Sequence, residues 1–84
     1  MVSYLILCRS LTHAQRTTHV LDRAKIKSHV TRTPRSIAAD GCGYCVRLEG
    51  SKPEAALRLL REAGLDPKQV YIYDESGTYR EVPL

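Results

Sequence analysis

The sequence predicts an α+β fold of the ferredoxin-like type: a βαββαβ sandwich with two helices on one face of an antiparallel sheet and a short C-terminal hairpin. Three observations support this prediction. Short apolar runs rich in β-branched residues and tyrosine indicate strands. Two longer segments carry apolar residues at helical spacing. The resulting order is strand, helix, strand, strand, helix, strand. With 84 residues, the chain is expected to form a single domain over residues 1–84.

The first strand and the first helix are predicted near the N-terminus. Val2–Cys8 is a short, mostly apolar run that predicts a buried strand. Apolar and small residues then recur at helical spacing, and we expect a helix over Leu11–Lys25. Either Ser10 or Thr12 is the expected N-cap, and Gln15 would complete a capping box with Thr12.

The second strand is expected at an edge of the sheet. Ile26–Thr33 is polar but rich in β-forming residues, with Val30 as its apolar centre. Pro34 ends the strand because proline has no N–H to donate to a neighbouring strand. Thr33–Asp40 shows no sustained period and therefore predicts a loop.

The third strand is predicted by an alternation of apolar and other side chains. Tyr44, Val46 and Leu48 alternate with residues of different character, which is a period of two. We therefore expect Cys45 and Arg47 to share one face of the sheet, with the apolar side chains on the other.

The second helix has the clearest boundaries and is expected over residues 52–63. Ser51 and Glu54 have the spacing of a capping box, and Pro53 suits the first turn of a helix. Gly64 is expected to end the helix through a glycine C-cap, and Leu65 is placed to make its hydrophobic contact.

A hairpin is predicted after the second helix. Val70–Tyr73 is expected to be a strand, Asp74–Gly77 a turn, and Thr78–Val82 a short partner strand. In the predicted architecture the second face of the sheet is open, and Tyr71 and Tyr73 would lie there beside the third strand.

Composition points to a small globular protein of a reducing compartment. Phe and Trp are absent, so the core must be built from smaller aliphatic residues, and we expect self-association through the open sheet face, for example as a homodimer. Three cysteines without a secretory signal favour a cytoplasmic location. No segment is long and apolar enough to predict a membrane span.

Positive charge is concentrated in the first half of the chain. Residues 1–36 contain a single acid, Asp22, against seven basic residues: Arg9, Arg16, Arg23, Lys25, Lys27, Arg32 and Arg35. This excess is compatible with a small RNA- or phosphate-binding module. No RNA-reading motif accompanies it, however, so we expect only weak, non-specific binding of nucleic acid.

Two of the three cysteines lie in one segment, Gly41-Cys42-Gly43-Tyr44-Cys45-Val46-Arg47. We expect this segment to form the functional site. A thiol acts as nucleophile or metal ligand only as thiolate, and nearby cations lower its pKa. Gly41 and Gly43 are expected to leave Cys42 uncrowded. The alternative is that Cys42 and Cys45 are small core residues, which is the role we expect for Cys8.

Two arginines are candidate partners of Cys42. Arg35 precedes the cysteine segment and Arg47 follows it, so both are expected to stabilise an anionic sulfur on Cys42. The alternative for each arginine is a surface ion pair, with Glu49 as the obvious partner of Arg47.

A dithiol redox protein or a zinc site is the main competing interpretation of Cys42 and Cys45. A single C-x-x-C provides only two of the four ligands of a closed zinc site, and the other candidates lack paired spacing. We therefore expect no metal and no cofactor. No catalytic triad, phosphate loop or dinucleotide fingerprint is present, which argues against an independent enzyme.

The Thr33-Pro34-Arg35 turn and the Cys42-Gly43-x-x-x-Arg47 segment, in this order and spacing, resemble the selenium/sulfur carrier protein-like family over most of residues 3 to 65. The resemblance implies that Cys42 transiently holds sulfur or selenium as a persulfide or selenenylsulfide. It also implies a cysteine desulfurase or selenium donor and an acceptor enzyme as partners. The sequence departs from the family at Cys45, where relatives more often have a small residue. This second thiol can attack a neighbouring persulfide and release sulfide.

Overall fold

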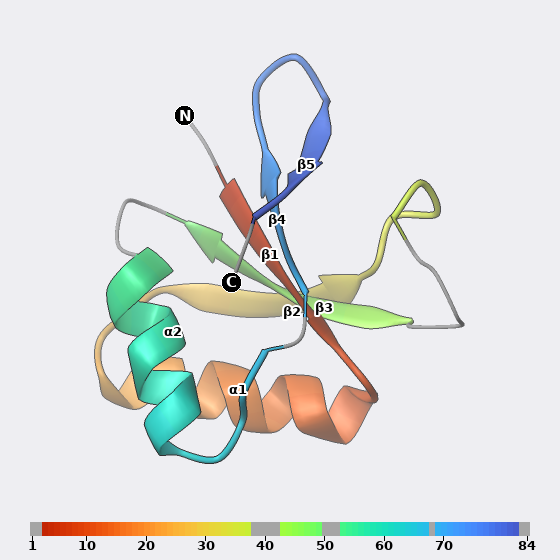
Figure 1. The fold of residues 1–84 in the computed structure, drawn as a ribbon. Coiled ribbons are helices and arrows are strands. Elements are labelled where there is room, and N and C mark those ends of the chain that lie inside the picture. Colours follow the sequence, from red (N-terminus) through yellow and green to blue (C-terminus); the bar gives the residue numbers. More distant parts are fainter. Residues whose placement is uncertain (1–2, 38–42, 50–52, 68, 83–84) are drawn as a thin grey trace.

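The elements follow one another in the predicted order of strand, helix, strand, strand, helix and a final strand pair (Figure 1). A computed structural model describes residues 3–37, 43–49, 53–67 and 69–82. The elements in these residues are β1 (Ser3–Cys8), α1 (Leu11–Arg23), β2 (Ser28–Arg32), β3 (Tyr44–Glu49), α2 (Pro53–Glu62), β4 (Val70–Tyr73) and β5 (Tyr79–Glu81). The α+β class is confirmed.

The strands form one antiparallel sheet in the order β2-β3-β1-β4-β5. The most apolar strand, β1, lies between β3 and β4, where neighbours on both sides satisfy its backbone groups. The polar strand β2 lies at an edge, as predicted. The finer assignment to the ferredoxin-like type stays a prediction.

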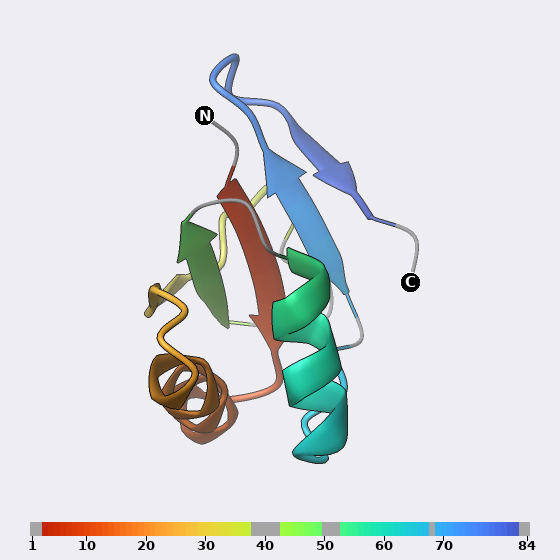
Figure 2. The same cartoon turned by 90° about the vertical axis from the view of Figure 1, so that its left-hand side faces the viewer.

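Both helices cover the same face of the sheet, as predicted (Figure 2). The core between the helices and the sheet is built from small and aliphatic side chains of β1, α1, β3, α2 and β4. Its buried members are Ile6, Cys8, Ala14, Leu21, Val46, Leu48, Ala56, Leu60 and Val70. We call this side of the sheet the helix face and the opposite side the second face.

Helix α1 begins where the sequence predicts and ends two residues earlier. The Ser10 hydroxyl accepts a hydrogen bond from the His13 backbone N–H at 3.1 Å, so Ser10 is the N-cap, and Thr12 lies inside the helix. At the other end, the Ile26 N–H donates to the Leu21 carbonyl at 2.9 Å. This closing bond places Lys25 in the left-handed region, with φ of 62°.

Replacing Lys25 with glycine is expected to stabilise the protein. Left-handed backbone costs a lysine more than a glycine, although glycine gains more entropy on unfolding, so we expect the free energy of unfolding to rise by about 0.5–1 kcal/mol. Urea denaturation measures the change. Lys27→Gly is the matched control, because Lys27 is also exposed but has no positive φ. An equal or larger gain from Lys27→Gly would contradict the explanation.

Helix α2 ends as the sequence predicts. Gly64 is left-handed, with φ of 76°, and the Leu65 N–H donates to the Leu60 carbonyl at 2.8 Å. Leu65 also packs against the core, which is the predicted hydrophobic contact. Pro53 is the first helical residue. The predicted N-cap, Ser51, lies outside the described residues.

The predicted hairpin of β4 and β5 is also present. The Asp74 side chain accepts hydrogen bonds from the backbone N–H groups of Ser76 at 3.0 Å and Thr78 at 3.3 Å. The hydrogen bond from the Ser76 hydroxyl is the main reason that the pKa of Asp74 lies below its ordinary value. Gly77 completes the turn with φ of 84°. Across the described residues, no helix is long and apolar enough to span a membrane.

Candidate functional site

Cys42 and Gly41 lie outside the described residues, so their predicted roles stay predictions. The described chain resumes at Gly43, whose carbonyl accepts a hydrogen bond from the Thr33 N–H at 3.1 Å. A Cβ added to Gly43 would meet no atom within 4 Å, and the backbone there is not left-handed. The described structure therefore does not require glycine at position 43.

Cys45 lies on the second face, where it shares a side of β3 with Arg47 as predicted. Cys45 is 0% exposed and forms a buried cluster with Leu5 and Leu7, against which Ile37 packs. The Cys45 thiol lies 3.9 Å from the Arg32 carbonyl oxygen, to which it donates. The second face is therefore covered at Cys45, and the expectation that this face is open holds only in part.

Ile37 is held against the cluster of Leu5, Leu7 and Cys45 by the turn that follows β2. The Ile37 N–H donates to the Pro34 carbonyl at 3.1 Å, which closes a single turn over residues 34–37. Arg35 is exposed on this turn. Because Cys42 lies outside the described residues, the role of Arg35 beside the Cys42 thiol stays a prediction.

The Arg47 side chain crosses the second face of the sheet. One terminal nitrogen, Nη2, lies 3.4 Å from the Ser3 hydroxyl, and the guanidinium carbon is 5.9 Å from the centre of the Tyr73 ring. Its Nε is buried and has no hydrogen-bond partner in the described chain. Among the described residues Arg47 also has no ion pair with Glu49, which was the alternative role for this arginine.

The end of the sheet where β3 begins is basic. Tyr44, the first residue of β3, pairs with Cys8 on one side and Arg32 on the other. The ends of β1 and β2 therefore meet the segment that follows Cys42. The Arg32 guanidinium carbon lies 5.4 Å from the centre of the Tyr44 ring.

Helix α1 starts at the same end of the molecule (Figure 1) and adds to this positive potential. The Arg9 backbone N–H donates to Nδ1 of His13 at 3.4 Å. Burial of the imidazole, followed by the positive charges of Arg9 and Arg16, holds the pKa of His13 below its ordinary value. A thiol at this end would also meet a positive potential, which favours the thiolate.

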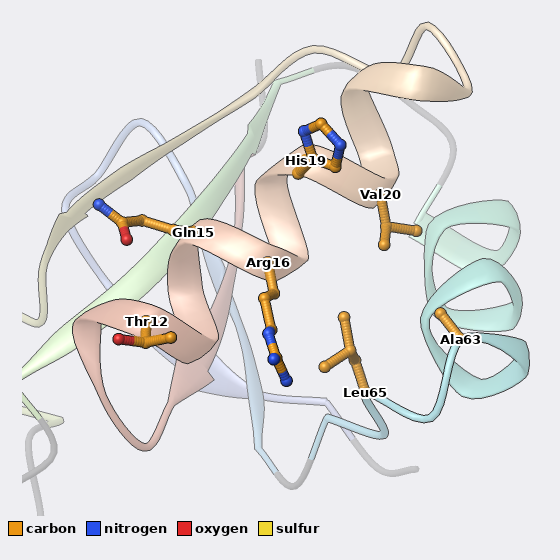
Figure 3. Close-up of a pocket in the computed structure, with 7 residues that line it drawn as sticks. All are labelled: Thr12, Gln15, Arg16, His19, Val20, Ala63 and Leu65. Atoms are coloured by element: carbon orange, nitrogen blue, oxygen red, sulfur yellow. The ribbon is translucent and has the colours of Figure 1, made fainter.

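Two hollows lie on opposite sides of the sheet. The smaller one, about 200 Å³, lies on the second face and is lined by Leu5, Thr31, Arg32, Pro34, Arg47, Tyr73 and Tyr79. We call it the second-face pocket. The larger one, about 520 Å³, lies between α1 and the end of α2 and is lined by Thr12, Gln15, Arg16, His19, Val20, Ala63 and Leu65 (Figure 3). Of these two hollows, the second-face pocket is the one whose described lining includes a candidate site residue, Arg47.

Within the described residues, no group of three or more His, Cys, Asp or Glu side chains is placed to hold a metal ion. The predicted zinc alternative depends on Cys42, which lies outside these residues. The homodimer likewise stays a prediction. In the described chain, Leu11 on α1 is the single large hydrophobic residue that is strongly exposed, and it does not lie on the second face.

These features define a small α+β protein with a buried thiol and a partly buried arginine side by side on one strand. Comparison with known families is more specific: residues 3–72 match the family described as "Putative Se/S carrier protein-like". The chain belongs to this family. The matched span includes the Thr-Pro-Arg turn, the cysteine segment and Arg47. No curated protein and no solved structure matched the chain.

Proposed function

We propose that this protein carries sulfur or selenium on Cys42, as a persulfide or selenenylsulfide, and transfers it to an acceptor enzyme. The observation that carries the proposal is membership of the carrier-like family over a span that includes Cys42, Gly43 and Arg47. In this proposal the protein is a carrier and not an independent enzyme. The C-x-x-C redox or zinc-binding protein is the alternative that the tests below separate from it.

Loading is a sulfur transfer between two thiols. The Cys42 thiolate attacks the outer sulfur of a persulfide on the donor, a new S–S bond forms on Cys42, and the donor cysteine leaves as thiolate. A cysteine desulfurase is a donor of this kind. The reaction needs Cys42 as thiolate near neutral pH.

The charges around the start of β3 support this chemistry. Arg9 follows the end of β1, Arg32 ends β2, and α1 begins beside them. A positive potential from these groups favours an anionic thiolate or persulfide over the neutral thiol. Arg35 and Arg47 are proposed to bind the anionic sulfur directly, Arg35 from the turn before the segment and Arg47 from the strand after it.

Incubating the reduced protein with a cysteine desulfurase and cysteine is expected to add the mass of one sulfur atom to Cys42. Mass spectrometry of the intact protein and of its peptides measures the addition. Cys42→Ser should abolish loading, because no other residue is proposed to accept the sulfur. Cys8→Ser is the control, since Cys8 is 1% exposed in the core on the helix face.

Loading that persists in Cys42→Ser would refute the carrier proposal. Wild-type protein that copurifies with stoichiometric zinc would instead support the metal-binding alternative. A selenium donor in place of cysteine tests the second cargo in the same assay, with the mass of one selenium atom as the expected gain.

A further inference from the structure

The second-face pocket places a positive charge among polar and apolar side chains. Its positive charge comes from Arg47, and none of its described lining residues is acidic. Arg32 also lines it, but the Arg32 guanidinium lies over the ring of Tyr44, which packs on the helix face. Leu5, Pro34 and the two tyrosine rings form much of the remaining wall. These apolar groups limit the contact of the pocket with water, which strengthens the interaction of the arginine with a bound anion.

Arg47 is the residue in this pocket whose hydrogen-bonding capacity is not satisfied. Its Nε–H is buried without a partner in the described chain, and its contact with Ser3 is long, at 3.4 Å. No carboxylate of the described residues pairs with it. A guanidinium presents Nε–H and one Nη–H side by side, and this pair of donors matches two oxygens of one anion.

We infer that the second-face pocket binds a small tetrahedral oxyanion, with Arg47 as its principal ligand. The anion would complete the hydrogen bonds of Nε and neutralise the guanidinium charge. The Thr31 hydroxyl, on the wall formed by β2, is placed as a further donor. A buried donor of this kind without a partner is otherwise unfavourable.

The size of the pocket limits the ligand. Its volume of about 200 Å³ is roughly six or seven times the volume of a water molecule in the liquid. An ion with five non-hydrogen atoms therefore fits together with a few waters, whereas a nucleotide does not. Phosphate, sulfate, thiosulfate and selenate share the required chemistry, and the experiment distinguishes among them.

This inference shares Arg47 with the proposed carrier function but uses no cysteine, so the two can be tested separately. The rings of Tyr73 and Tyr79 stack with centroids 4.8 Å apart and form the wall opposite β2. Arg47 lies between these two walls, since β3 and β1 run through the middle of the sheet. No described lining residue is a cysteine, and we expect Cys42→Ser to leave these walls intact.

The test is a titration of the ¹⁵N-labelled protein with each oxyanion, followed by NMR, against sodium chloride at matched ionic strength. We expect saturable shifts at the Arg47 Nε–H and at the backbone amides of Leu5 and Tyr73. Arg47→Gln should weaken binding by at least about tenfold, and Arg47→Lys by less, because lysine keeps the charge but loses the paired donors. Arg58→Gln, an equal loss of charge on α2, should have no effect.

The wild-type titration decides the question even if an Arg47 variant fails to fold. Shifts that do not saturate with any of the four anions, or saturable shifts centred at the start of α1 instead of Arg47, would overturn the inference. Binding of all four anions would make the site a general one for tetrahedral oxyanions. Binding confined to thiosulfate and selenate would assign it to the oxyanions of sulfur and selenium. Retained binding in Cys42→Ser separates this result from that of the carrier assay.

Discussion

Leu21→Ala is expected to lower the free energy of unfolding by about 2–5 kcal/mol. Leu21 is 0% exposed and lies in the core between the helices and the sheet. The substitution removes buried apolar surface and leaves a cavity that the neighbouring helix and strands fill only in part. A domain of 84 residues has a net stability of only a few kcal/mol, so a large fraction of the variant should be unfolded at 25 °C.

Denaturant unfolding followed by circular dichroism measures the loss. Leu11→Ala is the matched control, because it makes the same change in the same helix at a residue that is 41% exposed. We expect this control to change stability by no more than about 0.5 kcal/mol. Equal losses for the two variants would show that Leu21 does not anchor α1 to the sheet.

The elements of this fold could be predicted because each carries a local signal. The alternation over Tyr44–Leu48 assigns the two faces of β3, and Gly64 marks the end of α2. Each of these patterns involves only a few neighbouring residues, and the folded protein shows the structure that each pattern predicts. The predicted end of α1 is two residues too late, because the left-handed residue after the C-cap Ala24 is Lys25 in place of the usual glycine.

The surroundings of Cys45 and Arg47 could not be predicted in the same way. The pattern of β3 predicts both side chains on the second face, but the cluster that contains Cys45 is also packed by Ile37, which comes from a loop without a periodic pattern. The contacts of Arg47 with Ser3 and Tyr73 join residues far apart in sequence. Such contacts depend on the strand order, which brings β3, β1 and β4 together, and no local pattern encodes that order.

Cys45→Ala is expected to lengthen the lifetime of the loaded carrier by on the order of tenfold or more. In the loaded wild type, the Cys45 thiolate can attack the inner sulfur, which is the Sγ atom of Cys42. A disulfide between Cys42 and Cys45 forms and the outer sulfur leaves as hydrosulfide. An external thiol must then reduce the disulfide before the next loading. Alanine removes the attacking sulfur and should leave the persulfide in place.

The burial of Cys45 guides the choice of variant. Its side chain belongs to a buried apolar cluster with Leu5 and Leu7, so serine would place a hydroxyl there, whereas alanine adds no polar group. Burial also shields Cys45 from thiols in solution. The reaction that Cys45→Ala removes is therefore the attack of Cys45 on Cys42 within the same chain.

The lifetime is measured by intact-protein mass spectrometry after removal of the donor, together with the sulfide released. Cys8→Ala is the matched control, because it deletes an equally buried thiol from the helix face. We expect Cys8→Ala to release sulfide at the wild-type rate and Cys45→Ala to release it much more slowly. Equal rates in the two variants would show that Cys45 is a core residue that takes no part in discharge. The carrier role of Cys42 would then rest on loading alone.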